Sequence, residues 1–277
     1  MPPLLLILLS LCSFSSGFSE REILGKMLHA MDHVKTARYF LEKEERVDGK
    51  MIRSATHVKL HTHPMKAYLY MVHPDQGAEL LYVEGKNSNN ALINPNAFPY
   101  INLNLSPRNP ILTKDQHHTL LDLGFDYMSN LIRYNIRKDP DFFYSCLSRQ
   151  KDIVWKGKSY YVLSIDNKSF GYASYHVKKG ETFRSIAERH AINEYMVREA
   201  TGKTGIFSDV SEGDRIRIPN TYAKKIVLYV DKVNHLPLAQ IIYDDKGLYE
   251  KYEITDFVLN PPISDDEFTS RYKDYKF

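Results

Sequence analysis

The chain has 277 residues, which allows one large domain or two smaller ones. Its formal net charge of +3 is too small to predict a nucleic-acid-binding protein, and 43% hydrophobic residues are enough to form a core. The 20 tyrosines favour β structure, because aromatic side chains suit half-buried pleated surfaces.

The first 17 residues are typical of a secretory signal peptide. They carry no charge, and the apolar run 4–11 is followed by small residues up to Gly17. The run is too short to span a bilayer, and no Lys or Arg precedes it, unlike in most signal peptides. Cys12 is a poor candidate for a lipid anchor because Leu11, and not a small residue, stands before it. After cleavage Cys146 remains without a disulfide partner, and its apolar setting predicts a buried, inert thiol.

Amphipathic helices and alternating strands then follow one another along the chain. Ser19 and Glu22 form a capping-box pattern at the start of a helix that ends near Thr36. Asp48-Gly49 is a hairpin signal between the first two strands. A second long helix is predicted over 116–136, although Gly124 weakens it. The predicted strands are 37–47, 51–61, 66–72, 78–83, 153–154, 159–165, 171–177, 224–230, 238–243 and 248–254.

Residues 175–220 have the pattern strand, turn, helix, helix, strand. Lys179-Gly180 turns the chain, and Thr182 can cap a helix with one apolar face. The unit resembles a LysM module, a small βααβ domain that binds glycans containing N-acetylglucosamine. The residues that carry the resemblance are Val177, Gly180, Thr182, Ile186, Ala187, Gly213, Ile216, Ile218 and Pro219. The Asn that usually closes the second helix of that family is missing, since 200–203 reads Ala-Thr-Gly-Lys.

Outside this unit the chain resembles the LolA and LolB fold, and more closely a family of uncharacterised exported proteins, chiefly of Bacteroidetes, that share it. The segments that carry this resemblance are 64–69, 77–83, 94–99, 116–119, 236–237 and 252–261. It implies an α+β protein, an incomplete antiparallel β-barrel (LolA-like) covered by helices, with an inserted βααβ LysM-like module.

The predicted domains are the signal peptide 1–17, a discontinuous LolA-like half-barrel formed by 18–174 and 221–277, and the inserted LysM-like domain 175–220. The insertion falls between two sequential strands, so 170–174 is expected to face 224–229. We therefore expect a short Gly-Ser linker to replace the module and leave the barrel folded.

The sequence shows no pattern of catalytic residues. It contains no Gly-rich phosphate loop, GxSxG elbow or Cys/His pair with an orienting residue. We therefore expect a binding protein and not an enzyme, with no cofactor. His61 and His63, and His117 and His118, form two close pairs, and imidazole suits Zn or Cu. Without paired carboxylates or HExxH spacing, we expect these histidines to cap helices and lie on the polar surface, with no metal site.

Two binding sites are predicted. The LysM resemblance implies a glycan groove between two loops, formed by Gly180, Glu181, Thr182, Phe183, Gly205, Ile206 and Phe207. A concave sheet with helices across it can also enclose an apolar cavity. The aromatic residues expected to line that cavity are Tyr68, Tyr70, Tyr82 and Phe125, and ordinary packing is the other interpretation of the same side chains.

Two functions follow from these sites. In the first, the protein is an exported, monomeric, non-enzymatic binding protein of the periplasm or outer membrane. Its LysM-like module then associates with peptidoglycan or another N-acetylglucosamine glycan. In the second, the protein is a LolA-like carrier of lipid or lipoprotein acyl chains, and the module is purely structural. The two are compatible, because a carrier can be held close to peptidoglycan.

Overall fold

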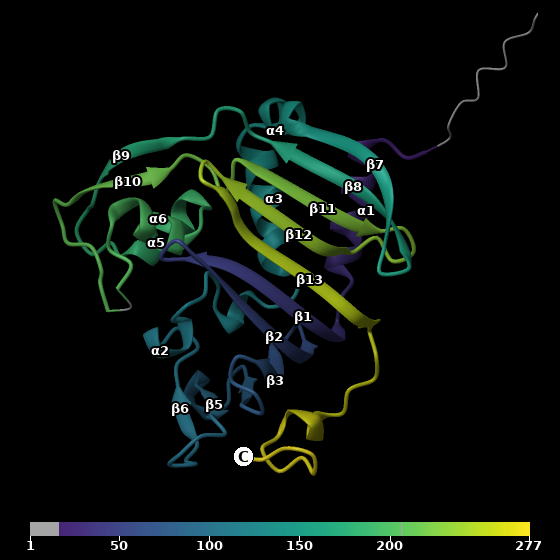
Figure 1. Ribbon diagram of the computed structural model, residues 1–277, viewed down its shortest axis with the longest axis vertical. Coiled ribbons are helices and arrows are strands. Elements are labelled where there is room, and N and C mark those ends of the chain that lie inside the picture. Colours follow the sequence, from purple (N-terminus) through teal and green to yellow (C-terminus); the bar gives the residue numbers. More distant parts are fainter. Residues whose placement is uncertain (1–16, 206) are drawn as a thin grey trace, which may run out of the picture.

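The computed structural model describes residues 17–205 and 207–277, and its main feature is one large antiparallel sheet (Figure 1). Residues 1–16 of the predicted signal peptide, with Cys12, and Ile206 of the predicted glycan groove lie outside the described residues. The strands are β1 (Thr36–Val47), β2 (Lys50–His61), β3 (Lys66–His73), β4 (Glu79–Val83), β5 (Ala91–Asn94), β6 (Leu103–Leu105), β7 (Leu147–Trp155), β8 (Lys158–Asp166), β11 (Lys225–Asp231), β12 (Pro237–Asp244) and β13 (Gly247–Leu259).

These eleven strands follow the order β6-β5-β4-β3-β2-β1-β13-β12-β11-β8-β7. Within the described residues β6 and β7 lie at opposite edges, so the sheet is not closed into a barrel. The predicted α+β class and open antiparallel half-barrel are therefore confirmed. Tight turns set the register of two hairpins. Asp48 and Gly49 both have positive φ between β1 and β2, as do Lys156 and Gly157 between β7 and β8.

Helices pack across one face of the sheet (Figure 1). The helices on this side are α1 (Glu20–Asp32), α2 (Pro110–Thr113), α3 (Asp126–Lys138) and α4 (Pro140–Cys146). The predicted capping box of Ser19 and Glu22 is present at the start of α1. The apolar side of α1 is fully buried through Ile23, Leu24 and Met27, which form the main core with the sheet. In the described part of the chain no helix is both long and apolar enough to cross a bilayer.

The predicted helix over 116–136 is only partly correct. A short 3₁₀ turn, η2 (Leu120–Asp122), is followed by a break, and α3 begins only at Asp126. Gly124 sets the break, because its φ of +87° is left-handed and a Cβ there would lie 2.9 Å from Leu60 Cδ2. The loop 114–119 is thereby free to run along the sheet and carry its two histidines.

A second unit is formed by β9 (Tyr172–His176), α5 (Phe183–His190), α6 (Glu194–Thr201) and β10 (Arg215–Pro219). β9 and β10 pair only with each other in the described chain and make a two-stranded sheet. The expected pairing of 170–174 with 224–229 is therefore wrong, since β8 pairs with β11 and β9 belongs to this unit. The βααβ order agrees with the sequence pattern, and we call residues 172–219 the module.

The module has its own small core and also a buried contact with the half-barrel. Met196 of α6, fully buried, packs with Val47, Ile242 and Tyr249 of the large sheet. The hydroxyl of Tyr249 donates to Asn193 Oδ1 at 2.8 Å. The module is thus attached through α6 as well as through its two connections.

Candidate functional site

A cavity of about 720 Å³ lies between the helix-covered face of the sheet and the segments that pack over it. Its apolar lining comes from alternate positions of several strands and from α3, including Leu69, Leu80, Ile226, Ile254, Met128 and Leu131. Only every second residue of a strand reaches the cavity, because successive side chains of a strand point to opposite faces of the sheet. Cys146, the free cysteine that α4 places at this cavity, is only partly buried, so the expected fully buried thiol is not observed.

The four aromatic residues predicted to line the cavity do not do so. Tyr68 and Tyr70 lie on the opposite face of β3, where the C-terminal segment packs on them and Tyr275 stacks on Tyr68 at 3.7 Å between ring centroids. Tyr82 and Phe125 are buried in the main core. On β3 it is Leu69 and Met71 that reach the cavity.

One wall of the cavity is polar, and a buried carboxylate, Glu250 of β13, lies at its centre. Glu250 accepts hydrogen bonds from His117 Nδ1 at 2.8 Å and from the Tyr222 hydroxyl at 2.6 Å, and the Tyr252 hydroxyl oxygen lies 3.1 Å away. His118 Nε2 lies 3.4 Å away. Burial opposes the charge of Glu250, but His118 and His117 outweigh burial and hold its pKa well below the usual range. The wall therefore contains an ionised carboxylate whose lone pairs are occupied.

His117 is fully enclosed, with no side-chain exposure. Its Nδ1 faces Glu250 at 2.8 Å and its Nε2 faces the Arg46 carbonyl at 3.0 Å, so both ring nitrogens point at acceptors. The ring is stacked between Tyr195 of the module and Tyr249 of β13, with centroids 4.8 and 4.2 Å away. The prediction of a surface or capping role is wrong for His117, which joins the module to the cavity wall.

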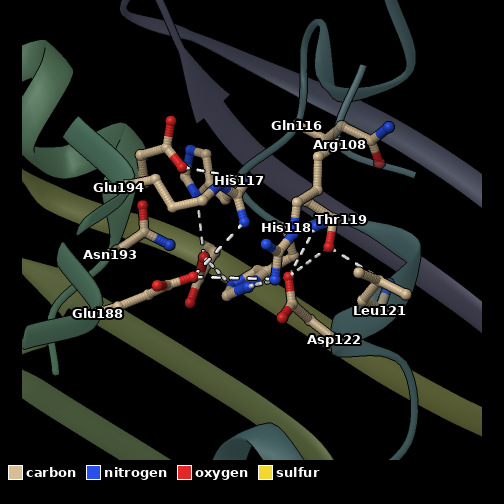
Figure 2. Close-up of polar contacts among 12 residues, drawn as sticks. Arg108, Gln116, His117, His118, Thr119, Leu121, Asp122, Glu188, Asn193 and Glu194 are labelled. Carbon is tan, nitrogen blue, oxygen red and sulfur yellow. Dashed lines mark hydrogen bonds and ion pairs between the residues drawn. The ribbon is translucent and has the colours of Figure 1, made fainter. Parts of the chain in front are cut away.

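His118, at the neighbouring position, is part of the cavity lining. The Tyr222 hydroxyl lies 3.1 Å from its Nε2, and Asp122 Oδ2 lies 3.9 Å from its Nδ1. Asp122 is itself engaged by the backbone N–H and hydroxyl of Thr119 (Figure 2). Burial disfavours a charged His118, yet the negative charge of Glu250 outweighs it and raises the pKa of His118.

Glu45, His117 and Glu250 offer metal-binding atoms within 4.8 Å of one another. The sequence search missed this group because its members are far apart in the chain and no short motif links them. In the structure these atoms are engaged with each other and with Tyr252, whose hydroxyl donates to Glu45 at 2.5 Å. The other histidine pair lies elsewhere: His61 contacts the Pro64 carbonyl, and His63 lies 3.1 Å from Asp126.

The described residues of the predicted glycan groove, which do not include Ile206, lie at one end of the module. Thr182 caps α5, and the backbone N–H of Phe183 donates to Asp209 Oδ1 at 2.8 Å, which brings the two expected loops together. Glu181 and Phe183 point inward, however, and Phe183 is fully buried in the module core. Gly180 adopts a φ of +77°, Gly205 lies in the second loop, and Phe207 beside it is 78% exposed. Among the described residues of the predicted groove, Phe207 is therefore the exposed large apolar side chain.

Comparison with known proteins places the chain in a family. A family model described as "Protein of unknown function (DUF1571)" matches residues 34–182, and the chain belongs to that family. No curated protein matches the sequence.

Several solved structures are similar in fold. LprF from Mycobacterium bovis is 10% identical, with a TM-score of 0.43, and the match covers 88% of this chain and 94% of that one. The lipoprotein LppX from Mycobacterium tuberculosis is 12% identical, with a TM-score of 0.41 and coverage of 88% and 97%. A LolA superfamily protein from Nitrosomonas europaea is 11% identical, with a TM-score of 0.34 and coverage of 92% and 100%. The LolA-like resemblance, the LysM identity of the module and the Bacteroidetes origin stay predictions from the sequence.

Proposed function

We propose that this DUF1571 protein is an exported, non-enzymatic carrier that shelters an apolar chain, such as the acyl chain of a lipid or lipoprotein, inside its half-barrel. The cavity carries this proposal. Its volume of about 720 Å³ is within the range of roughly 300–1,000 Å³ that is typical of small-molecule sites. Its strands and α3 supply mostly aliphatic side chains.

The energetics favour such a ligand. Each methylene group removed from water contributes about 0.8 kcal/mol, so a long acyl chain has a large driving force to enter an apolar cavity. Part of this favourable free energy is offset by the conformational entropy that the acyl chain and the protein lose on binding.

Filling the cavity tests the proposal. Ile226 of β11 lines the cavity, whereas the next residue, Val227, points to the other face, and both are partly buried. We expect Ile226→Trp to reduce binding of a fluorescent fatty acid by the delipidated protein at least tenfold, and Val227→Trp to leave it unchanged. Equal binding by both variants, with both folded by circular dichroism, would place the ligand outside the cavity.

Binding of peptidoglycan by the module is the second candidate function. The βααβ order, the contact between the two loops and the exposure of Phe207 favour it, since an exposed aromatic ring can pack on a sugar. Sedimentation with purified peptidoglycan tests it, with Phe207→Ser as the variant that should lose binding. Phe98→Ser is the matched control, because Phe98 is also exposed but lies outside the module. If the wild type stays in solution, the module is structural and the carrier function stands alone.

A further inference from the structure

The polar wall described above is unusual for a cavity that otherwise suits a hydrocarbon chain. Its two buried carboxylates are engaged by donors of the protein. Glu250 accepts from His117 and Tyr222, and Glu45 accepts from Tyr252 and the backbone N–H of His117. The Tyr127 hydroxyl, the His118 ring and Asp122 line the cavity beside them.

Two donors are available at this wall. The proton of the Tyr222 hydroxyl goes to Glu250, so Tyr222 presents only its oxygen to His118 Nε2. His118 Nδ1 lies 3.9 Å from Asp122, which is beyond hydrogen-bond distance. The Tyr127 ring packs edge-on against His118, with centroids 5.0 Å apart, and within the described residues its hydroxyl donates to no carboxylate. Tyr127 and His118 both line the cavity.

The charges around this wall allow an anion to approach. The acids are Glu45, Glu250 and Asp122, and the bases are Lys43, His117 and His118. Three acids thus face three basic side chains. A carboxylate is therefore not repelled by the group as a whole, although Asp122 lies 3.9 Å from His118 Nδ1.

We propose that Tyr127 and His118 bind the acyl oxygens of the cargo, a carboxylate or an ester carbonyl at the end of its apolar chain. The inference rests on the proposed function, because it needs the chain in the cavity. The cargo is then bound in one orientation. Its oxygen end lies at the wall formed by β13 and η2, and its hydrocarbon chain extends along the aliphatic side chains of the other strands. An ammonium end group offers no acceptor to these donors.

Three probes with the same chain length test this in the delipidated full chain: palmitic acid, methyl palmitate and hexadecylamine. We expect the wild type to bind the acid and the ester more tightly than the amine. Tyr127→Phe removes one hydroxyl and should weaken the ester about 2- to 10-fold and the acid about tenfold or more, because hydrogen bonds to charged groups are stronger. Binding of the amine should not change. His118→Gln should weaken the acid more than the ester, since it removes a charge.

Tyr134→Phe is the control, because Tyr134 is on the same helix but is not part of the cavity lining. It should leave all three affinities unchanged, and thermal unfolding of each variant separates binding from loss of fold. If no probe binds to the wild type, the proposed carrier function itself fails. If all three probes bind equally to the wild type, or Tyr127→Phe changes none of them, the carrier function stands and the assignment of these donors is wrong.

Discussion

In contrast to the expectation from the sequence that the module can be removed freely, its buried contact with the large sheet predicts that deletion weakens the half-barrel substantially, although the module lies in a connection between β8 and β11. The ends can be joined easily, because the backbone of Asn220 already donates to the Gly171 carbonyl at 2.9 Å. Replacing residues 172–219 with a short Gly-Ser linker therefore adds only a small loop-closure cost. The main loss of stability comes instead from the side chains of the large sheet that α6 covers, because deletion exposes them to water.

The magnitude follows from what α6 covers. Tyr249 is fully buried, and Val47 and His117 are buried beneath the same helix. A fully buried apolar side chain contributes about 1.5–3 kcal/mol relative to an exposed one. Uncovering Tyr249 and Val47 alone should therefore cost roughly 3–6 kcal/mol, before the loss of the Tyr249–Asn193 hydrogen bond. That is comparable to the total stability of many domains, which is about 5–15 kcal/mol.

Urea unfolding followed by Trp fluorescence measures this directly, because Trp155 of β7 is the single tryptophan of the chain and lies in the half-barrel. Met196→Ala and Ile186→Ala make a matched pair, since both side chains are fully buried, the first against the sheet and the second inside the module. Met196→Ala should lower the unfolding free energy reported by Trp155 by about 2–5 kcal/mol. A deletion protein as stable as the full chain would refute the reasoning and support a freely removable module.

Three further predictions concern single residues. Glu250→Gln should cost about 3–5 kcal/mol in urea unfolding, because it removes the counter-charge that raises the pKa of His118 and one partner of the buried His117 ring. The folded-state pKa of Glu250 is lowered, so its stabilisation is present above the unfolded pKa of about 4.3 and is lost as pH falls below it. Acid unfolding should therefore be less steep in Glu250→Gln. Gly124→Ala should lower the melting temperature through its positive φ and the contact with Leu60, whereas Gly25→Ala, in an open helical position, should raise it.

The open sheet and the module's order of elements could be predicted because their signals are local. The capping box of Ser19 and the turn at Asp48-Gly49 depend on residues a few positions apart, and both are present. The helix start was misplaced because a left-handed glycine at 124 breaks a segment whose apolar spacing continues through it.

The site could not be predicted in the same way, because its positions depend on distant partners. Alternation along β3 separates Tyr68 from Leu69 but does not say which face meets the helices. The C-terminal segment determines which face is which, because it covers Tyr68. This segment is distant in the sequence, and the contact of Lys59 with Tyr275, for example, joins residues 216 positions apart. His117 is similar: its partner Glu250 is 133 residues away, so no local pattern marks it as buried.

Stability does not explain why a buried ionic group stands at the wall of an apolar cavity. Replacing a buried ion pair with well-packed hydrophobic residues is often neutral or stabilising, because removing charges from water is costly. An apolar wall would also suit a plain hydrocarbon better. Glu250 raises the pKa of His118 and accepts from the Tyr222 hydroxyl, while Tyr195 of the module stacks on His117 behind this wall. A wall that orients donors toward the cavity at this cost is best explained by a cargo with a polar end to recognise.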